Sequence, residues 1–229
     1  GEIVVLGDGG SNYRKEIYPE YKANRKERYA EQTPAEAKEF ENFLAEFSTT
    51  LKTLSRNGYL TLKYSGVEAD DIAALITQNR EQLGLDEIWM VSSDRDWDLL
   101  VDGNVSRFST VTRKETTVHN WDEHYDFEIE DYITFKCLTG DKGDNVPGIP
   151  GVGPKRAVQL MEQYGTVFDI YDSCPIEGKY KYIQSLNENA EQLLMNVELM
   201  DLVTYSEEAI GKDNIQVINE EIIKRREDG

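Results

Sequence analysis

Apolar residues near the start of the chain form one short run and one long periodic pattern. The run Ile3-Val4-Val5-Leu6 ends at Gly7-Asp8-Gly9-Gly10, which is typical of a buried strand followed by a turn. Further on, Thr33-Pro34 is a good helix start. The apolar residues that then recur at helical spacing, before Asn57-Gly58 stops the pattern, are Phe40, Phe43, Leu44, Phe47, Leu51 and Leu54. They predict one long amphipathic helix.

The segment between these two elements has a different character. Tyr13 to Tyr29 is rich in Tyr, Lys and Arg and has no clear apolar periodicity. Without an apolar face it has little reason to pack into a core. We therefore expect a mobile, partly helical segment on the surface.

Strands and helices alternate through the middle of the chain and then give way to helices. The patterns predict strands at 60–64, 87–92, 105–108 and 116–118, and helices at 70–82 and 97–100. Later helices are predicted at 132–138, 154–164, 167–171 and 190–201. Such alternation indicates an α/β fold with a mainly parallel central sheet flanked by helices on both faces. We expect an α/β core over residues 1–131 and a helical subdomain over residues 132–229.

The charge balance is strongly acidic, with 44 Asp and Glu against 25 Lys and Arg and a net charge of −19. At face value this argues against a nucleic-acid partner. Basic residues are nevertheless concentrated at 14–28, at 155–156 and at Lys179 and Lys181. Local strips of this kind can still meet a phosphate backbone.

Composition also limits location and metal chemistry. No apolar run approaches the ~20 residues that span a bilayer, and the first residues form no targeting signal, so we expect a soluble, cytoplasmic protein without a membrane partner. Cys137 and Cys174 lie far apart in no metal-ligand spacing, and the two histidines are His119 and His124. We expect packing thiols and no zinc site.

Carboxylates gather at the ends of three predicted elements. These residues are Asp8, Glu68, Asp70, Asp71, Asp94 and Asp96. The crevice beyond the carboxyl ends of strands is where open α/β sheets bind ligands, so Asp8, Asp94 and Asp96 are expected to face one site. Two structural alternatives remain open. Acids at 68–71 could cap a helix, and those at 94–98 could form a solvated turn.

Several carboxylates in one crevice would need cations between them. Like charges ~4 Å apart repel by ~4 kcal/mol at an effective dielectric near 20. Oxygen ligands without His or Cys favour Mg²⁺ or Mn²⁺. Two such ions can activate water and stabilise the leaving oxygen of a phosphodiester.

A glycine-rich stretch follows in the predicted helical part. It reads Gly140-Asp141-Lys142-Gly143-Asp144-Asn145 and continues to Gly148-Ile149-Pro150-Gly151-Val152-Gly153-Pro154-Lys155-Arg156. Glycines let a backbone approach a phosphate, and the next helix start offers free N–H groups. Lys155 and Arg156 run against the helix dipole, which an adjacent phosphate would explain. The alternative is an ordinary glycine-rich turn.

Four stretches carry a family resemblance in this order: Tyr21-Lys22-Ala23-Asn24-Arg25, Gly66-Val67-Glu68-Ala69-Asp70-Asp71, Ser93-Asp94-Arg95-Asp96 and residues 140–145. They resemble the motifs of the 5′ nuclease superfamily, which includes bacteriophage flap endonucleases and the 5′-3′ exonuclease domain of bacterial DNA polymerase I. The resemblance covers nearly the whole chain, and residues 192–202 are most similar to the phage members.

The resemblance implies two metal sites. One would use mainly Glu68, Asp70, Asp71 and Asp94, and the other Asp96, Asp141 and Asp144, with Asp8 assisting. It also implies that Lys22 and Arg25 lie on a helical arch, about residues 13–36, and contact the scissile phosphate. A solvated basic helix is the alternative for that pair.

The resemblance also assigns a role to the glycine-rich stretch. It would belong to a helix-hairpin-helix element at about 140–165 that grips duplex backbone through amides and a K⁺ ion. The implied DNA contacts are Gly148, Gly151, Gly153, Lys155 and Arg156. This element distinguishes the family from other nucleases with a similar acidic crevice.

One departure from the family pattern concerns its beginning. The family starts with a central strand that ends in an Asp-Gly pair, followed by a helix and a loop, before the strand that matches Ile3 to Leu6. Nothing in residues 1–229 supplies that segment. We expect the physical molecule to contain it, together with one more acid in the metal crevice.

The combined prediction is a monomeric, structure-specific DNA 5′ nuclease, a flap endonuclease and 5′-3′ exonuclease with a two-metal-ion mechanism. Its expected substrates are flaps, nicked duplexes and free 5′ ends, with RNA primer–DNA hybrids as further candidates. One alternative is a protein that binds DNA structures without hydrolysis. Another is a PIN-type RNA nuclease, which shares the acids but does not explain the glycine hairpin.

Overall fold

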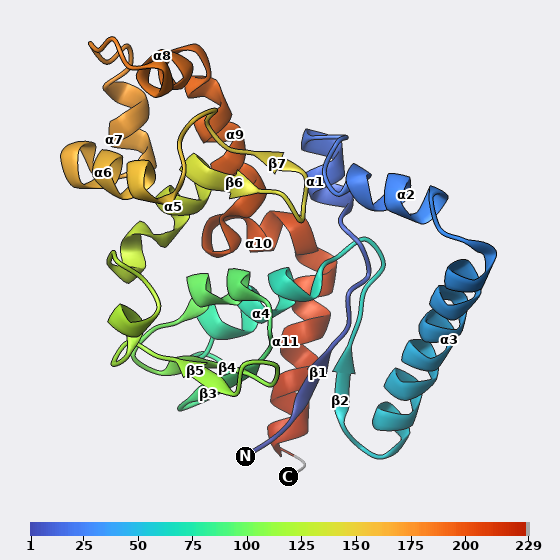
Figure 1. Cartoon of the computed structure of the whole chain (residues 1–229). Coiled ribbons are helices and arrows are strands. Elements are labelled where there is room, and N and C mark those ends of the chain that lie inside the picture. The colour runs from blue at the N-terminus through green and yellow to red at the C-terminus, as the bar shows by residue number, and fades with distance from the viewer. Residues whose placement is uncertain (228–229) are drawn as a thin grey trace. The chain divides into compact units, whose positions relative to one another are not determined.

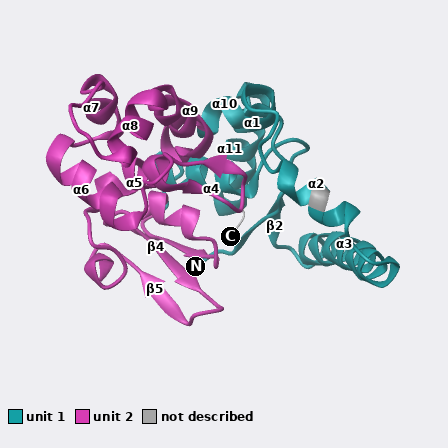
Figure 2. Ribbon diagram, turned by 45° about the horizontal axis from the view of Figure 1, so that its top comes forward, with its two compact units in different colours: residues 1–85, 206–229 teal, residues 86–205 magenta. Residues whose placement is uncertain are grey.

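The computed structural model describes residues 1–227, with the side chain of residue 27 left aside, and the chain divides into two compact units. Unit 1 comprises residues 1–85 and 206–229, and unit 2 comprises residues 86–205 (Figure 2). Within residues 1–227, no helix is both long enough and apolar enough to cross a membrane.

Unit 1 contains a parallel pair of strands with helices around it. Strand β1 (Val4–Leu6) pairs with β2 (Leu60–Leu62) in parallel, as Figure 1 shows. Helix α4 (Ala69–Gln78) forms the centre of the core, because every side chain from Asp71 to Thr77 is buried. The C-terminal helix α11 (Lys212–Glu227) contacts β2 and buries Ile218 and Ile222.

The predicted long helix is confirmed as α3 (Pro34–Arg56), 23 residues long. Its start has a complete capping box, in which the Thr33 hydroxyl accepts from the Glu36 N–H and the Glu36 carboxylate accepts from the Thr33 N–H. None of its side chains is buried. Its aromatic residues Phe40, Phe43 and Phe47 instead form a stacked row, which Tyr29 of the preceding segment extends, with ring centroids 4.7 to 6.3 Å apart.

The segment at 13–29 is helical, but the prediction that it lies on the surface is wrong for part of it. It forms α1 (Asn12–Ile17) and α2 (Ala23–Ala30). Arg14 and Tyr21 are almost completely buried, at 2% and 4% exposure. Arg14 is buried because it pairs with two carboxylates of unit 1, a partnership that apolar periodicity does not reveal.

Unit 2 begins with a sheet in the order β3-β4-β5. Strands β3 (Ile88–Val91) and β4 (Val105–Ser109) are parallel, whereas β5 (Lys114–Thr116) is antiparallel to β4. A 3-10 helix, Arg95–Leu100, follows β3 where a short helix was expected. Its buried Asp98 accepts a hydrogen bond of 2.9 Å from Arg107 Nη2 on β4, which ties helix and sheet together.

The rest of unit 2 is almost entirely helical, as expected. The helices are α5 (Tyr132–Thr139), α6 (Pro154–Tyr164), α7 (Val167–Asp172), α8 (Lys181–Glu188) and α9 (Ala190–Met200), and α10 (Leu202–Ile210) begins in unit 2 and ends in unit 1. A two-residue pair, β6 (Gly140–Asp141) and β7 (Val146–Pro147), closes the loop after α5. The patterns did not predict α8, α10, α11 or this pair.

The α/β class with flanking helices is confirmed. The predicted boundary at residues 131 and 132 follows the order of elements along the chain, whereas the two units group elements by contact. It stays a prediction.

Candidate metal and nucleic-acid site

Asp8 of unit 1 lies in a loop that is fastened to the loop before α4. The Gly9 N–H donates to the Val67 carbonyl at 2.9 Å, and the Gly66 N–H donates to the Gly9 carbonyl at 2.8 Å. A Cβ on Gly9 would come within 1.8 Å of the Tyr64 carbonyl oxygen, so only glycine permits this approach. The loop geometry thus brings the backbones next to Asp8 and Glu68 together.

Arg14 holds the acids at the start of α4. Its Nη1 donates to Glu68 Oε2 at 2.7 Å and to Asp71 Oδ2 at 2.8 Å, and its Nη2 donates to Asp71 Oδ1 at 2.7 Å. Glu68 and Asp71 are each 1% exposed. Both carboxylates are therefore enclosed within unit 1, while Asp70 beside them is half-buried.

Two residues of the basic segment converge on Glu68. Lys22 Nζ pairs with Glu68 Oε1, and the Tyr21 hydroxyl donates to the same oxygen at 3.3 Å. Lys22 adopts a left-handed backbone with φ 57° immediately before α2, and its ammonium lies 5.0 Å from the centre of the Tyr21 ring. Arg25 lies in the first turn of α2 and is half-buried.

The electrostatics of Glu68 reflect these partners. Burial acts to raise the pKa of its carboxyl group, but the charges of Arg14 and Lys22 outweigh burial and hold that pKa below its ordinary value. Glu68 therefore stays ionised despite its enclosure.

Unit 2 contains a second, more open group of carboxylates. Asp96, Asp141 and Asp144 each offer an oxygen, and these atoms lie within 4.8 Å of one another. Ligands at about 2–2.5 Å from an Mg²⁺, Mn²⁺ or Ca²⁺ ion lie within about 5 Å of each other, so the spacing suits one hard divalent cation. All three residues are half-buried, which leaves a route for an ion to enter.

A turn places two of these acids together. Asp141 Oδ1 accepts from the Gly143 N–H at 2.7 Å and from the Asp144 N–H at 3.2 Å. Asn145 closes the turn with a left-handed φ of 58°. The other oxygen of Asp141 remains directed at Lys136 Nζ, 3.5 Å away.

Lys136 is the counter-charge of this cluster. It projects from α5, is buried, and pairs with Asp96 Oδ1 as well as with Asp141. Burial and the charges of Asp94 and Asp141 raise the pKa of Asp96 above its ordinary value, with Lys136 opposing them. Lys136 therefore pairs with two of the three clustered acids, Asp96 and Asp141.

Asp94 has a local role of its own. Its Oδ1 accepts from the Asp96 N–H at 2.9 Å and caps the 3-10 helix. It is exposed and is not among the three clustered residues. Capping fixes the backbone from which Asp96 projects.

The predicted hairpin joins α5 to α6, and the fold requires glycine at some of its glycine positions but not at all of them. A Cβ on Gly148 would lie 2.3 Å from the Thr139 carbonyl carbon, and Gly151 has a left-handed φ of 81°. Gly153, in contrast, has extended backbone, and its Cβ would meet nothing within 4 Å. The fold therefore explains two of these glycines and leaves the third for another reason.

The two basic residues at the start of α6 also differ. Arg156 Nη1 donates to the Gly151 carbonyl at 2.6 Å, and its guanidinium lies 4.7 Å from the centre of the Tyr182 ring. Arg156 thus stabilises the hairpin from within, whereas the sequence had suggested only a contact with a phosphate. Lys155 is exposed and makes no hydrogen bond or ion pair within residues 1–227.

Sequence reasoning missed Arg14 and Lys136 as site residues. Arg14 was hidden in a stretch that contains several other basic residues. Lys136 did carry a signal, since it is the one charged residue in the otherwise apolar and small run from Tyr132 to Thr139. A buried charge of this kind needs a partner.

Comparison with known proteins identifies the family. Residues 1–126 match the model described as "5'-3' exonuclease, N-terminal resolvase-like domain", and residues 127–221 match "5'-3' exonuclease, C-terminal SAM fold". The chain belongs to the 5′-3′ exonuclease family, and the resemblance found in the four motifs is confirmed.

The relatives include a phage enzyme. The chain is 40% identical to the flap endonuclease of Escherichia phage T5 over 226 residues, which covers 96% of this chain and 77% of that protein. It is 30% identical to DNA polymerase I of Rhizobium leguminosarum, covering 88% of this chain but 19% of the polymerase.

A solved structure of the T5 protein has the same fold. A complex of the T5 flap endonuclease with DNA and metal ions aligns with a TM-score of 0.92 at 39% identity, covering 99% of this chain and 84% of that one. Divalent metal ions, in that case zinc, are bound in another solved structure of the T5 enzyme, and the described residues of this chain include an acidic cluster of suitable spacing.

Proposed function

We propose that this protein is a metal-dependent DNA 5′ nuclease that hydrolyses phosphodiesters at 5′ flaps, nicks and free 5′ ends, acting as a monomer. The observation that carries the proposal is the cluster of Asp96, Asp141 and Asp144 in a chain of the 5′-3′ exonuclease family. The DNA bound in the T5 complex supports the choice of substrate.

The residues present fit a hard divalent cation. Their donors are carboxylate oxygens that lie within 4.8 Å of one another, and the three residues are half-buried. Mg²⁺ or Mn²⁺ suits such donors best. Ions bound there would supply an activated water and neutralise charge on the leaving oxygen.

The remaining ligands are proposed from the family resemblance. They are Asp8, Glu68, Asp70 and Asp71 of unit 1 and Asp94 of unit 2. Arg14 fixes Glu68 and Asp71 in one orientation, since it donates to both of them. This preorganisation spares the site a rearrangement during reaction.

Lys22 and Arg25 are proposed to contact the scissile phosphate. A cation placed where negative charge develops lowers the barrier more than it strengthens ground-state binding. Lys22 is held by Glu68 and by the face of the Tyr21 ring. These two contacts with the rest of the fold therefore fix the position of the Lys22 ammonium group.

The hairpin is proposed to grip duplex backbone without reading bases. Gly148 and Gly151 shape the turn, while Gly153 and Lys155 are left for phosphates, and a K⁺ ion would bind among the hairpin carbonyls. Arg156 supports the turn through its hydrogen bond to Gly151. Phosphates are alike in every sequence, so this contact positions the duplex and does not select it.

The decisive experiment compares cleavage and binding of a 5′-flap duplex by the protein and by Asp141→Asn. Asn keeps the oxygen that accepts from Gly143 but removes the charge, so turnover in Mg²⁺ should be lost while flap affinity is retained. Asp122→Asn, an exposed acid of unit 2 outside the cluster, is the matched control and should cleave normally.

Three results would count against the proposal. Full cleavage in excess chelator would show that the reaction needs no metal ion. Flap binding with no cleavage by the unaltered protein in Mg²⁺ or Mn²⁺ would select a structure-binding protein without hydrolysis. Stronger competition by duplex RNA than by duplex DNA would select an RNA nuclease.

A further inference from the structure

A short basic and aromatic stretch in unit 2 lies outside the proposed metal and hairpin roles. Lys179, Tyr180, Lys181 and Tyr182 alternate charge and ring directly before and into α8, in a chain whose net charge is −19. The Tyr180 side chain is 64% exposed. An exposed aromatic ring flanked by cations is typical of surfaces that bind single-stranded nucleic acid.

The rings of this stretch form an ordered ladder. Tyr180 and Tyr182 are stacked, with centroids 5.9 Å apart and planes 20° apart. The Arg156 guanidinium lies 4.7 Å from the centre of the Tyr182 ring. Tyr182 thus contacts both Arg156 and Tyr180, and Tyr180 is the exposed member of the ladder.

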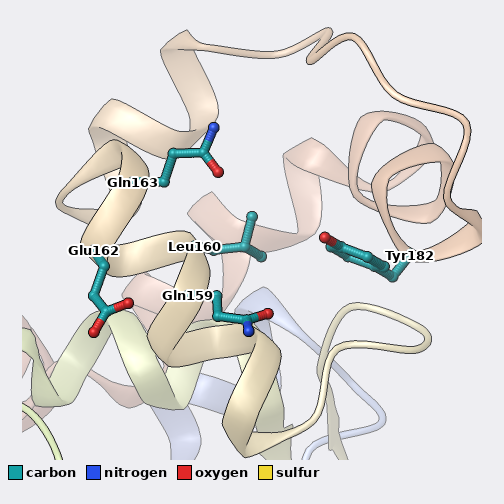
Figure 3. Close-up of a pocket in the computed structure, with 5 residues that line it drawn as sticks. All are labelled: Gln159, Leu160, Glu162, Gln163 and Tyr182. Atoms are coloured by element: carbon teal, nitrogen blue, oxygen red, sulfur yellow. The ribbon is translucent and has the colours of Figure 1, made fainter.

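A pocket adjoins the ladder between α6 and α8. It has a volume of about 420 Å³ and is lined by Gln159, Leu160, Glu162, Gln163 and Tyr182. In Figure 3, Gln159, Leu160 and Gln163 project from α6 on the side that faces Tyr182, whereas the Glu162 carboxylate points the other way. The pocket therefore combines an apolar centre, an aromatic wall and two amides.

The two amides are available to a ligand. Gln163 Nε2 donates to the Tyr164 hydroxyl at 3.0 Å, which leaves its carbonyl oxygen as an acceptor. Gln159 is exposed, and its amide makes no hydrogen bond within the described residues. An amide pairs with a nucleobase edge such as that of thymine, because each offers a donor and an acceptor.

We propose that this pocket and the Tyr180–Tyr182 ladder bind an unpaired nucleobase of single-stranded DNA. The base stacks on the exposed tyrosine or enters the pocket beside Tyr182, where Gln159 and Gln163 meet its edge. Lys179 and Lys181 meet the neighbouring phosphates. This contact goes beyond the proposed function, resting on it only for the choice of DNA, and is separate from the duplex grip of Gly153 and Lys155.

The first test measures the affinity for a short oligothymidine by fluorescence anisotropy in excess chelator. Tyr180→Ala should weaken binding by roughly 5- to 150-fold, the range expected for loss of one stacked base. Tyr180→Phe keeps the ring and should bind as the unaltered protein does. Phe168→Ala removes an equally exposed ring of the same unit, on α7, and should change nothing.

The second test locates the contact directly. An oligothymidine carrying one 5-iodouracil is crosslinked by light and the modified peptide is sequenced by mass spectrometry. Crosslinks at Tyr180 or Tyr182 support the proposal. Crosslinks confined to other segments, or equal affinities of Tyr180→Ala and Phe168→Ala, overturn it.

Failure here is distinguishable from failure of the proposed nuclease. Both tests run without a divalent metal and need no cleavage, whereas the nuclease is tested by flap cleavage in Mg²⁺. Cleavage without Tyr180-dependent binding would sink this inference alone. Tyr180-dependent binding without cleavage would sink the nuclease alone.

Discussion

The two acidic regions of the molecule treat their carboxylates in opposite ways. In unit 1, Glu68 and Asp71 are 1% exposed and share the guanidinium of Arg14. In unit 2, Asp96, Asp141 and Asp144 remain half-buried, and Lys136 pairs with the first two of them. The first group is enclosed by the fold, and the second stays accessible to a ligand.

This contrast separates residues that the fold needs from residues that a ligand needs. A buried charge without a partner is costly, so the fold itself fixes the acids of unit 1. The hairpin repeats the same contrast, because Arg156 is engaged by Gly151 and Tyr182 while Lys155 and Gly153 face open space. In the hairpin, the groups without such a contact are the ones expected to meet phosphate, whereas the proposed metal ligands Glu68 and Asp71 would bind from positions that the fold already fixes.

The largest expected effect is on folding and concerns Arg14. Arg14→Met would leave Glu68 and Asp71 buried with too little positive charge, and should lower the free energy of unfolding by about 3–5 kcal/mol. Urea denaturation followed by circular dichroism measures it. Lys38→Met removes a cation whose pair with Glu41 is fully at the surface and should leave the midpoint unchanged. Equal midpoints for both variants would mean that unit 1 does not depend on this pairing.

The second prediction concerns metal binding in unit 2. Mg²⁺ at 100 times its dissociation constant should stabilise the protein by about 2.7 kcal/mol, because the ion binds the folded state alone. Asp141→Asn should lose this increment, and Asp122→Asn should keep it. The measurement is the thermal midpoint in chelator and in Mg²⁺. If Asp141→Asn were stabilised by Mg²⁺ as much as the unaltered protein is, the ion would bind outside this cluster.

How much of this was visible in the sequence depends on how local each signal is. Helix α3 was predicted closely, because Thr33 and Pro34 at one end and Asn57 at the other are local signals. The burial of Arg14 was not predicted, because its partners Glu68 and Asp71 lie 54 and 57 positions away in the sequence. Lys136 and Asp96 are likewise 40 positions apart.

The candidate site shows the same limit. The clusters at 68–71, 94–96 and 141–144 were found because motif residues stand next to each other in sequence. Which acids would be enclosed and which left open depends on Arg14 and Lys136, which meet them only in the folded chain. Helix α8 was missed because its first residues, Lys181 and Tyr182, continue a basic and aromatic stretch.

The third prediction concerns catalysis by the cations of unit 1. Lys22→Ala or Arg25→Ala should lower the single-turnover rate on a 5′-flap duplex by about tenfold or more, with a smaller effect on affinity, because these cations act on developing charge. Quenched-flow cleavage and a binding titration in Ca²⁺ separate the two quantities. Lys26→Ala, an exposed cation on the same helix, is the control. Unchanged rates would exclude a role for these two cations in cleavage.

The fourth prediction concerns the glycine that the fold does not require. Gly153→Ala should keep the thermal midpoint but weaken duplex binding by about fivefold, near the ~1 kcal/mol of one hydrogen bond, because its methyl group would fill the space that a phosphate needs. Gly148→Ala should instead destabilise unit 2, since its Cβ would overlap the Thr139 carbonyl group. Gly103→Ala, at another open position, should alter neither property. Normal duplex affinity in Gly153→Ala would contradict a close backbone approach at this hairpin.

The smallest expected effect belongs to Lys155, the exposed cation next to that glycine. If Lys155 neutralises one phosphate, Lys155→Ala should reduce the slope of log affinity against log salt by about one unit, because one fewer counterion is released on binding. The affinity should fall by the same factor for every duplex sequence, since phosphates carry no base information. Anisotropy titrations at several salt concentrations on two unrelated duplexes measure both properties. Lys114→Ala, an exposed cation on β5, provides the matched loss of charge and should leave the slope unchanged. An equal change of slope in both variants would show that Lys155 acts only through the net charge of the protein, and would remove the hairpin from the surfaces left open for a ligand.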